Sequence, residues 1–92
     1  MSARSHLALL HELRCVVCEH MGVTQDSRTE AHHLESVRDE NSHYAAVALC
    51  EWHHIGAFGV HKLSRRGFEM RYKLTPIDLL SLTIKQLDMR KS

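Results

Sequence analysis

Two short segments decide how this chain folds: CVVC at residues 15–18 and CEWH at residues 50–53. Together they offer three thiols and one imidazole, in two pairs separated by about thirty residues. Such a set can close a tetrahedral zinc site, a common structural combination. We therefore predict a structural Zn²⁺ bound by Cys15, Cys18, Cys50 and His53. A metal cross-link would suit this chain, because 92 residues allow only a modest hydrophobic core.

The length also predicts a single domain over residues 1–92, without repeats or a linker. Three cysteines cannot all pair with one another in one chain, which argues against a disulfide framework. No segment resembles a signal peptide, and no apolar run is long enough to span a membrane. We expect a reduced, cytoplasmic protein with no membrane partner.

The apolar pattern around these segments predicts an α+β fold. Leucines at positions 7, 10 and 13 recur at helical spacing and indicate a helix over residues 5–14. Two strands are expected at residues 30–36 and 44–49, joined by an irregular loop, with a helix beginning near Cys50.

After this core, two glycines and two capping residues set the expected boundaries. Gly56 and Gly59 should interrupt the helix that follows Cys50, which would leave His61 in a loop. Ser64 can cap a helix running to about residue 73. Thr75 followed by a proline can start a last helix that ends near residue 89. The two C-terminal helices are therefore expected over about residues 64–89, after a core of about residues 15–61.

Charge is distributed unevenly although the formal net charge is only +1. Five basic residues and a single acid fall within residues 62–73, whereas residues 26–40 are rich in acids. The basic segment could face the phosphates of a nucleic acid, or it could be an ordinary solvated helix surface. The candidate phosphate-binding residues are Lys62, Arg65 and Arg66.

Between the two cysteine segments lies EAHHL at residues 30–34, followed by the apolar run that ends in VALC at residues 47–50. This pattern closely resembles the HNH nucleases, whose fold is a hairpin and a helix around one metal, and the resemblance spans residues 15–61. It implies a second metal, Mg²⁺ or Mn²⁺, that promotes hydrolysis of a DNA phosphodiester. It also implies that His33 is the general base and that His32 points to the metal. A base whose pKa is near neutrality suits the activation of water.

The last ligands depart from the family pattern, which commonly ends Cys-x-x-Cys-His-x-x-x-His. His53 replaces the second cysteine and keeps a competent zinc ligand. Phe58 occupies the position of the final histidine. We therefore predict that His54 and His61 join His32 at the catalytic metal.

The position of the family's central asparagine is also altered, because Ala45 stands there. Either Asn41 or His43 could orient His33 instead. Together with Phe58, this departure leaves a second interpretation open: a zinc-stabilised module that binds DNA or protein on an HNH scaffold without turnover.

The stretch over residues 53–69 is similar to small recombination-enhancement nucleases of temperate phages, which cut DNA held by a recombinase filament. This resemblance implies a phage or prophage origin and a role in recombination or replication. It also implies that the protein acts on DNA, with a recombinase filament as a possible partner.

Overall fold

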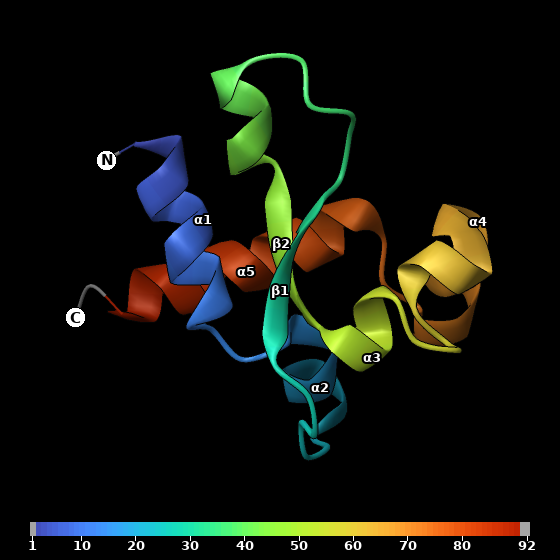
Figure 1. Ribbon diagram of the computed structural model, residues 1–92. Helices are drawn as coiled ribbons and strands as arrows, with labels where there is room; N and C mark the ends of the chain where they lie inside the picture. Colours follow the sequence, from blue (N-terminus) through green and yellow to red (C-terminus); the bar gives the residue numbers. More distant parts are fainter. Residues whose placement is uncertain (1, 91–92) are drawn as a thin grey trace.

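Two antiparallel strands lie at the centre of the fold, with helices packed around them (Figure 1). The computed structural model describes residues 2–90. Its elements, in chain order, are α1 (Ala3–His11), α2 (Val16–Met21), β1 (Thr29–His33), the short 3-10 helix η1 (Glu40–Tyr44), β2 (Ala46–Cys50), α3 (Glu51–His54), α4 (Val60–Tyr72) and α5 (Pro76–Arg90). This is the predicted α+β fold, with one hairpin, an N-terminal helix and two C-terminal helices.

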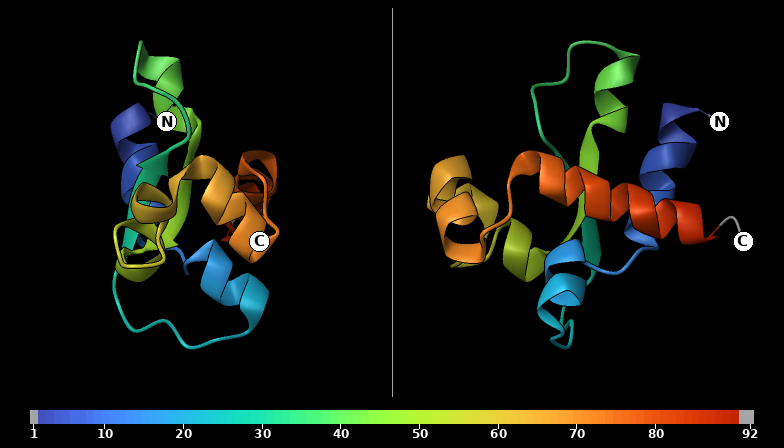
Figure 2. Two further views of the ribbon diagram at one scale, coloured as in Figure 1. Left: turned by 90° about the vertical axis from the view of Figure 1, so that its right-hand side faces the viewer. Right: turned by 180° about the vertical axis from the view of Figure 1, so that it is seen from behind.

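The hairpin pairs five residues of β1 with five of β2, beginning with Thr29 opposite Cys50. Strand β2 is buried along its whole length, and helix α5 crosses one side of the hairpin (Figure 2). On that side the Ala48 N–H donates to the Thr83 hydroxyl at 3.3 Å. This bond gives an amide of a buried strand the partner it needs, because an unpaired buried amide is costly.

The hydrophobic core lies where β2 meets the surrounding helices. Its largest fully buried side chains include Leu10, Val16, Leu49 and Phe68. The three cysteine side chains belong to the same core, with at most 2% of each residue exposed. The predicted zinc donors are therefore inside the protein, where a bound ion would cross-link α2, β2 and α3.

Helix α1 begins and ends earlier than the leucine spacing predicted. It starts at Ala3 because the Ser2 hydroxyl accepts a hydrogen bond from the Ser5 N–H at 3.1 Å. It ends at His11, with Glu12 as its C-cap, and the chain then turns towards the cysteine cluster. The turn is held by α5, where the Gln86 side chain bonds both the N–H and the carbonyl of Arg14 at 3.1 and 2.8 Å.

The strands are also shorter than, or shifted from, their predicted ranges. Strand β1 ends at His33 rather than at residue 36, and β2 runs from Ala46 to Cys50 rather than over 44–49. The connection contains η1, which the sequence did not predict. Asp39 caps η1 by accepting a hydrogen bond from the Ser42 N–H at 3.2 Å, so residues assigned to strand and loop form a helical turn.

The prediction that His61 lies in a loop was wrong. Helix α4 begins at Val60, directly after Gly59, and contains His61 in its first turn. The helix is kinked at Ser64, whose φ of 69° is not helical. The Ser64 hydroxyl accepts from the Gly67 N–H at 3.3 Å, so the second part of α4 does begin at the predicted cap.

Gly56 and Gly59 separate α3 from α4, as predicted, because the backbone comes too close to α3 there for a larger residue. A Cβ atom on Gly59 would lie 2.8 Å from the backbone of His54. Only glycine lets the chain return this closely to α3. The close approach places the first turn of α4 beside α3.

The last helix, α5, starts with the predicted capping residues. Asp78 N–H donates to the Thr75 hydroxyl at 3.0 Å, and Thr75 N–H donates to the Asp78 carboxylate at 2.8 Å. Pro76 is its first residue, and the helix ends at Arg90. Within residues 2–90, no helix combines the length and the apolar character needed to cross a membrane.

Candidate metal centres

The four predicted zinc ligands converge in the core. Cys15 and Cys18 come from the start of α2, Cys50 ends β2, and His53 lies in α3. The Cys18 and Cys50 sulfurs are 3.8 Å apart. The Nδ1 atom of His53 lies 3.6 Å from the Cys15 and Cys18 sulfurs and 3.2 Å from that of Cys50.

These distances can be compared with a tetrahedral zinc site. Zn–S bonds of about 2.3 Å and Zn–N bonds of about 2.0–2.1 Å separate two sulfurs by about 3.8 Å, and a sulfur and a nitrogen by about 3.6 Å. The four side chains thus already have nearly the spacing that Zn²⁺ requires. The donor type fits as well, because thiolate and imidazole are the usual ligands of structural zinc.

Among the four side chains of this cluster there is no lysine or arginine that would stabilise thiolates. Burial, reinforced by the neighbouring thiols, raises the pKa of Cys18 to about 12. Burial also raises the pKa of Cys15 and lowers that of His53. All three shifts disfavour charge, so a cation at the centre is the group that would allow the thiols to ionise.

A second cluster contains only histidines: His32 from β1, His54 from α3 and His61 from α4. One ring nitrogen of each lies within 4.8 Å of the others. The Nε2 atoms of His54 and His61 are 3.1 Å apart. His61 is exposed and the other two are partly buried. The three predicted ligands are therefore brought together, in a site with access to solvent.

The electrostatic environment of His32 also suits a metal ligand. Burial, together with the nearby rings of His54 and His61, lowers the pKa of His32 to about 4. The ring is thus neutral near pH 7 and keeps a lone pair for coordination. Three imidazoles fill only part of a coordination sphere, which leaves positions for water and substrate.

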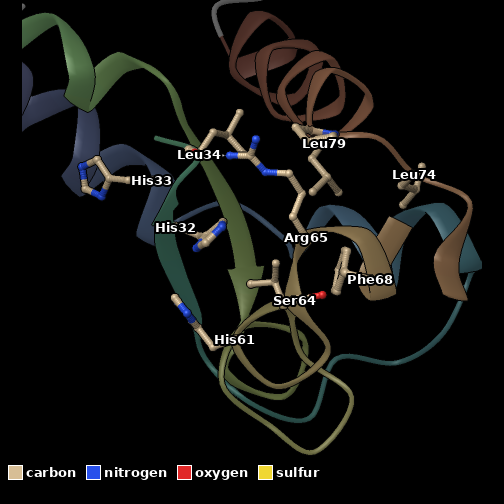
Figure 3. Close-up of a pocket in the computed structure, with 11 residues that line it drawn as sticks. His32, His33, Leu34, His61, Ser64, Arg65, Phe68, Leu74 and Leu79 are labelled. Atoms are coloured by element: carbon tan, nitrogen blue, oxygen red, sulfur yellow. Dashed lines mark hydrogen bonds between the residues drawn. The ribbon is translucent and has the colours of Figure 1, made fainter. Parts of the chain in front are cut away.

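His32 and His33 are the last two residues of β1, and their side chains point to different sides of the strand (Figure 3), as expected for neighbouring strand residues. Both residues nevertheless line one cavity of about 290 Å³, together with His61 and Arg65. Two members of the histidine cluster, His32 and His61, therefore open onto the same cavity as His33.

The side chain of His33 contacts His43, a residue of η1. Its Nε2 atom lies 3.0 Å from Nδ1 of His43, and the two rings meet edge to face. Of the two residues expected to orient His33, His43 makes this contact, whereas Asn41 is exposed. Burial, and next the proximity of His43, lowers the pKa of His33. The ring is neutral near pH 7, and its Nδ1 atom is left for another partner.

Phe58, which stands where the family pattern has a histidine, lies outside the histidine cluster. Its ring packs 6.0 Å from that of Trp52, and the Arg71 guanidinium lies 4.1 Å from its centre. Its carbonyl accepts a hydrogen bond from the Tyr72 hydroxyl at 2.9 Å. His61 thus supplies the third imidazole from a different turn.

The family model described as "recombination enhancement, RecA-dependent nuclease" matches residues 2–88. The chain belongs to this family. No curated protein and no solved structure gives a significant match.

In this member of the RecA-dependent nuclease family, the predicted phosphate-binding residues lie on α4. Arg65 lines the cavity, and its Nη2 atom donates to the Leu34 carbonyl at 2.6 Å and to Glu35 at 3.2 Å. Lys62 and Arg66 are exposed. Arg65 is therefore the one that the fold fixes at the rim of the site.

Sequence reasoning missed one residue that contacts the histidine cluster. The Glu30 carboxylate lies 2.9 Å from Nδ1 of His54. A signal was available, because Glu30 and His32 are two positions apart and share one face of β1. Its contact with His54 depends on where α3 turns back, which the sequence pattern does not specify.

Proposed function

We propose that this chain is a metal-dependent DNA endonuclease of the HNH type that hydrolyses phosphodiester bonds. The observation that carries the proposal is the cluster of His32, His54 and His61, two of which, His32 and His61, line one cavity together with His33. The membership in a nuclease family supports it. The proposed unit is one domain over residues 1–92, acting in the cytoplasm of a bacterial host if it is phage-encoded.

In this proposal the buried cluster holds Zn²⁺ for stability and the histidine cluster holds Mg²⁺ or Mn²⁺ for catalysis. Bound there, the divalent ion would neutralise charge on the phosphate oxygens and on the leaving oxygen. Cys15, Cys18, Cys50 and His53 would serve only the structural ion, because a closed tetrahedral site has no free position.

His33 would act as the general base. His43 can accept a hydrogen bond from Nε2–H of His33, which leaves the Nδ1 lone pair to take a proton from water. A neutral ring is required for this step, and the lowered pKa of His33 keeps it neutral. Arg65 would hold a phosphate at the cavity rim, with Lys62 and Arg66 contributing along α4.

The proposal is tested by incubating the zinc-loaded protein with supercoiled plasmid and Mg²⁺ or Mn²⁺, with and without a recombinase filament. Nicking or linearisation that depends on the divalent ion supports an endonuclease. DNA binding without cleavage under every condition would instead favour the alternative of a binding module on the same scaffold.

The His54→Ala variant should separate the two metal centres. We expect cleavage to be lost, because one of three ligands is removed, while one zinc per chain and the thermal transition are retained. Zinc content by mass spectrometry and the transition by circular dichroism check this. Loss of zinc together with activity would place His54 in the structural site and contradict the assignment.

The Arg65→Ala variant should weaken DNA binding similarly for all sequences. Removing one phosphate contact is expected to reduce the slope of log K against log salt by about one. Fluorescence anisotropy over a salt series measures this slope. Arg90→Ala is the matched control, because Arg90 forms its ion pair with Glu12, away from α4. An equal change in both variants would contradict a specific role for Arg65.

A further inference from the structure

We infer that Glu30 is a positioning residue for the histidine cluster: its carboxylate fixes the ring of His54 so that Nε2 faces the metal position. The inference rests on the proposed function, because it concerns how the second metal would be held. Glu30 is not a ligand in the cluster formed by His32, His54 and His61.

The contact with Glu30 determines which ring nitrogen of His54 carries the hydrogen. Its Nδ1 atom lies 2.9 Å from a Glu30 carboxylate oxygen. An ionised carboxylate can only accept, so Nδ1 must carry the hydrogen. In a neutral ring this leaves the lone pair on Nε2, the atom that lies 3.1 Å from Nε2 of His61. The ring is then in the tautomer that a metal needs.

Water has limited access to the hydrogen bond between Glu30 and His54. The side chains of Glu30 and His54 are only 19% and 15% exposed. A glutamate carboxylate is ordinarily ionised near pH 7. The guanidinium of Arg28 lies 3.6 Å from the second carboxylate oxygen. A partly buried, ionised acceptor forms a stronger hydrogen bond than an exposed neutral one.

The register of β1 against β2 places Glu30 and His32 on the side of the strand that faces His54. Glu30 and His32 occupy one face of the strand, since alternate residues point the same way. Glu30 pairs with Leu49, just before the chain leaves β2 for α3 and His54. One strand face therefore supplies both a ligand and the support for a second ligand from another element. Hydrogen-bonded carboxylates commonly orient metal-binding histidines in this way.

The competing explanation is a plain ion pair that only stabilises the fold. An ion pair of that kind would affect the thermal transition without selecting one tautomer. The two explanations therefore differ in metal affinity, in the ring spectrum of His54, and in whether glutamine can replace the glutamate.

The experiment measures Mn²⁺ binding by electron paramagnetic resonance on protein that carries one zinc per chain. Glu30→Ala should bind Mn²⁺ about 10- to 100-fold more weakly than the unmodified protein. Glu30→Gln keeps an acceptor oxygen and should recover most of that loss. Glu12→Ala, which removes an exposed ion pair elsewhere, is the control and should not change the affinity.

A second measurement needs no variant. Nitrogen-15 spectra of the unmodified zinc-loaded protein should show His54 with its hydrogen on Nδ1 before Mn²⁺ is added. A hydrogen on Nε2, equal Mn²⁺ affinity in Glu30→Ala, or equal losses in the alanine and glutamine variants would each overturn the inference. If the unmodified protein binds no Mn²⁺, the proposed catalytic metal site itself fails, which is a distinguishable result.

Discussion

Replacing His33 with alanine is expected to lower the single-turnover rate of DNA cleavage by about 10² to 10⁴-fold, the usual effect of losing a positioned base. His33 lines the cavity next to His32 but does not belong to the cluster of three ligands. Mn²⁺ affinity, zinc content and DNA affinity should therefore be retained. Quenched-flow measurement with excess enzyme over DNA isolates the chemical step from product release.

The control for this experiment must exclude a contaminating nuclease. His54→Ala protein, purified identically, should show no cleavage, so any remaining rate in the His33→Ala sample can be assigned. Cleavage by His33→Ala at the unmodified rate, with an inactive His54→Ala control, would rule out the general-base role. A loss of Mn²⁺ binding in His33→Ala would instead show that His33 is itself a ligand.

The members of both clusters could be predicted from the sequence because only a few residue types commonly bind metals. Three cysteines and a histidine with this spacing match a common ligand set of structural zinc. Cys15 and Cys50 could therefore be assigned to one zinc site without any knowledge of the fold. His61 lies beside His32 and His54, but in a helix rather than in the predicted loop. Its helix depends on the close return of Gly59 to α3, a contact that the linear pattern does not contain.

The supporting residues were harder to predict for the same reason. His43 and Asn41 were equivalent candidates in sequence, and η1 determines which of them contacts His33. Glu30 was overlooked because its partner lies twenty-four positions away on α3. Candidate ligands can thus be recognised from residue type, whereas the residues that hydrogen-bond to them depend on how the loops close.

Replacing Cys15 with serine is expected to destabilise the whole domain. Zinc binding in small zinc-binding peptides contributes about 10–16 kcal/mol, comparable to or larger than the roughly 5–15 kcal/mol that keep a typical domain folded. Cys15 is fully buried at the start of α2, so its loss weakens the ion that joins α2 to β2 and α3. Even a partial loss of about 3 kcal/mol should lower Tm by more than about 10 °C.

Scanning calorimetry with zinc analysis after dialysis tests this expectation. The unmodified protein should retain about one zinc per chain, and a chelator strong enough to remove it should reproduce the unfolding seen in Cys15→Ser. His20→Ala is the matched control, because His20 is exposed at the end of α2 and lies outside the cluster. An unchanged Tm in Cys15→Ser would show that the four side chains do not bind a structural ion. The apolar core would then have to stabilise three buried thiols beside an imidazole without a cation, although burial raises the pKa values of Cys15 and Cys18 and disfavours thiolates there.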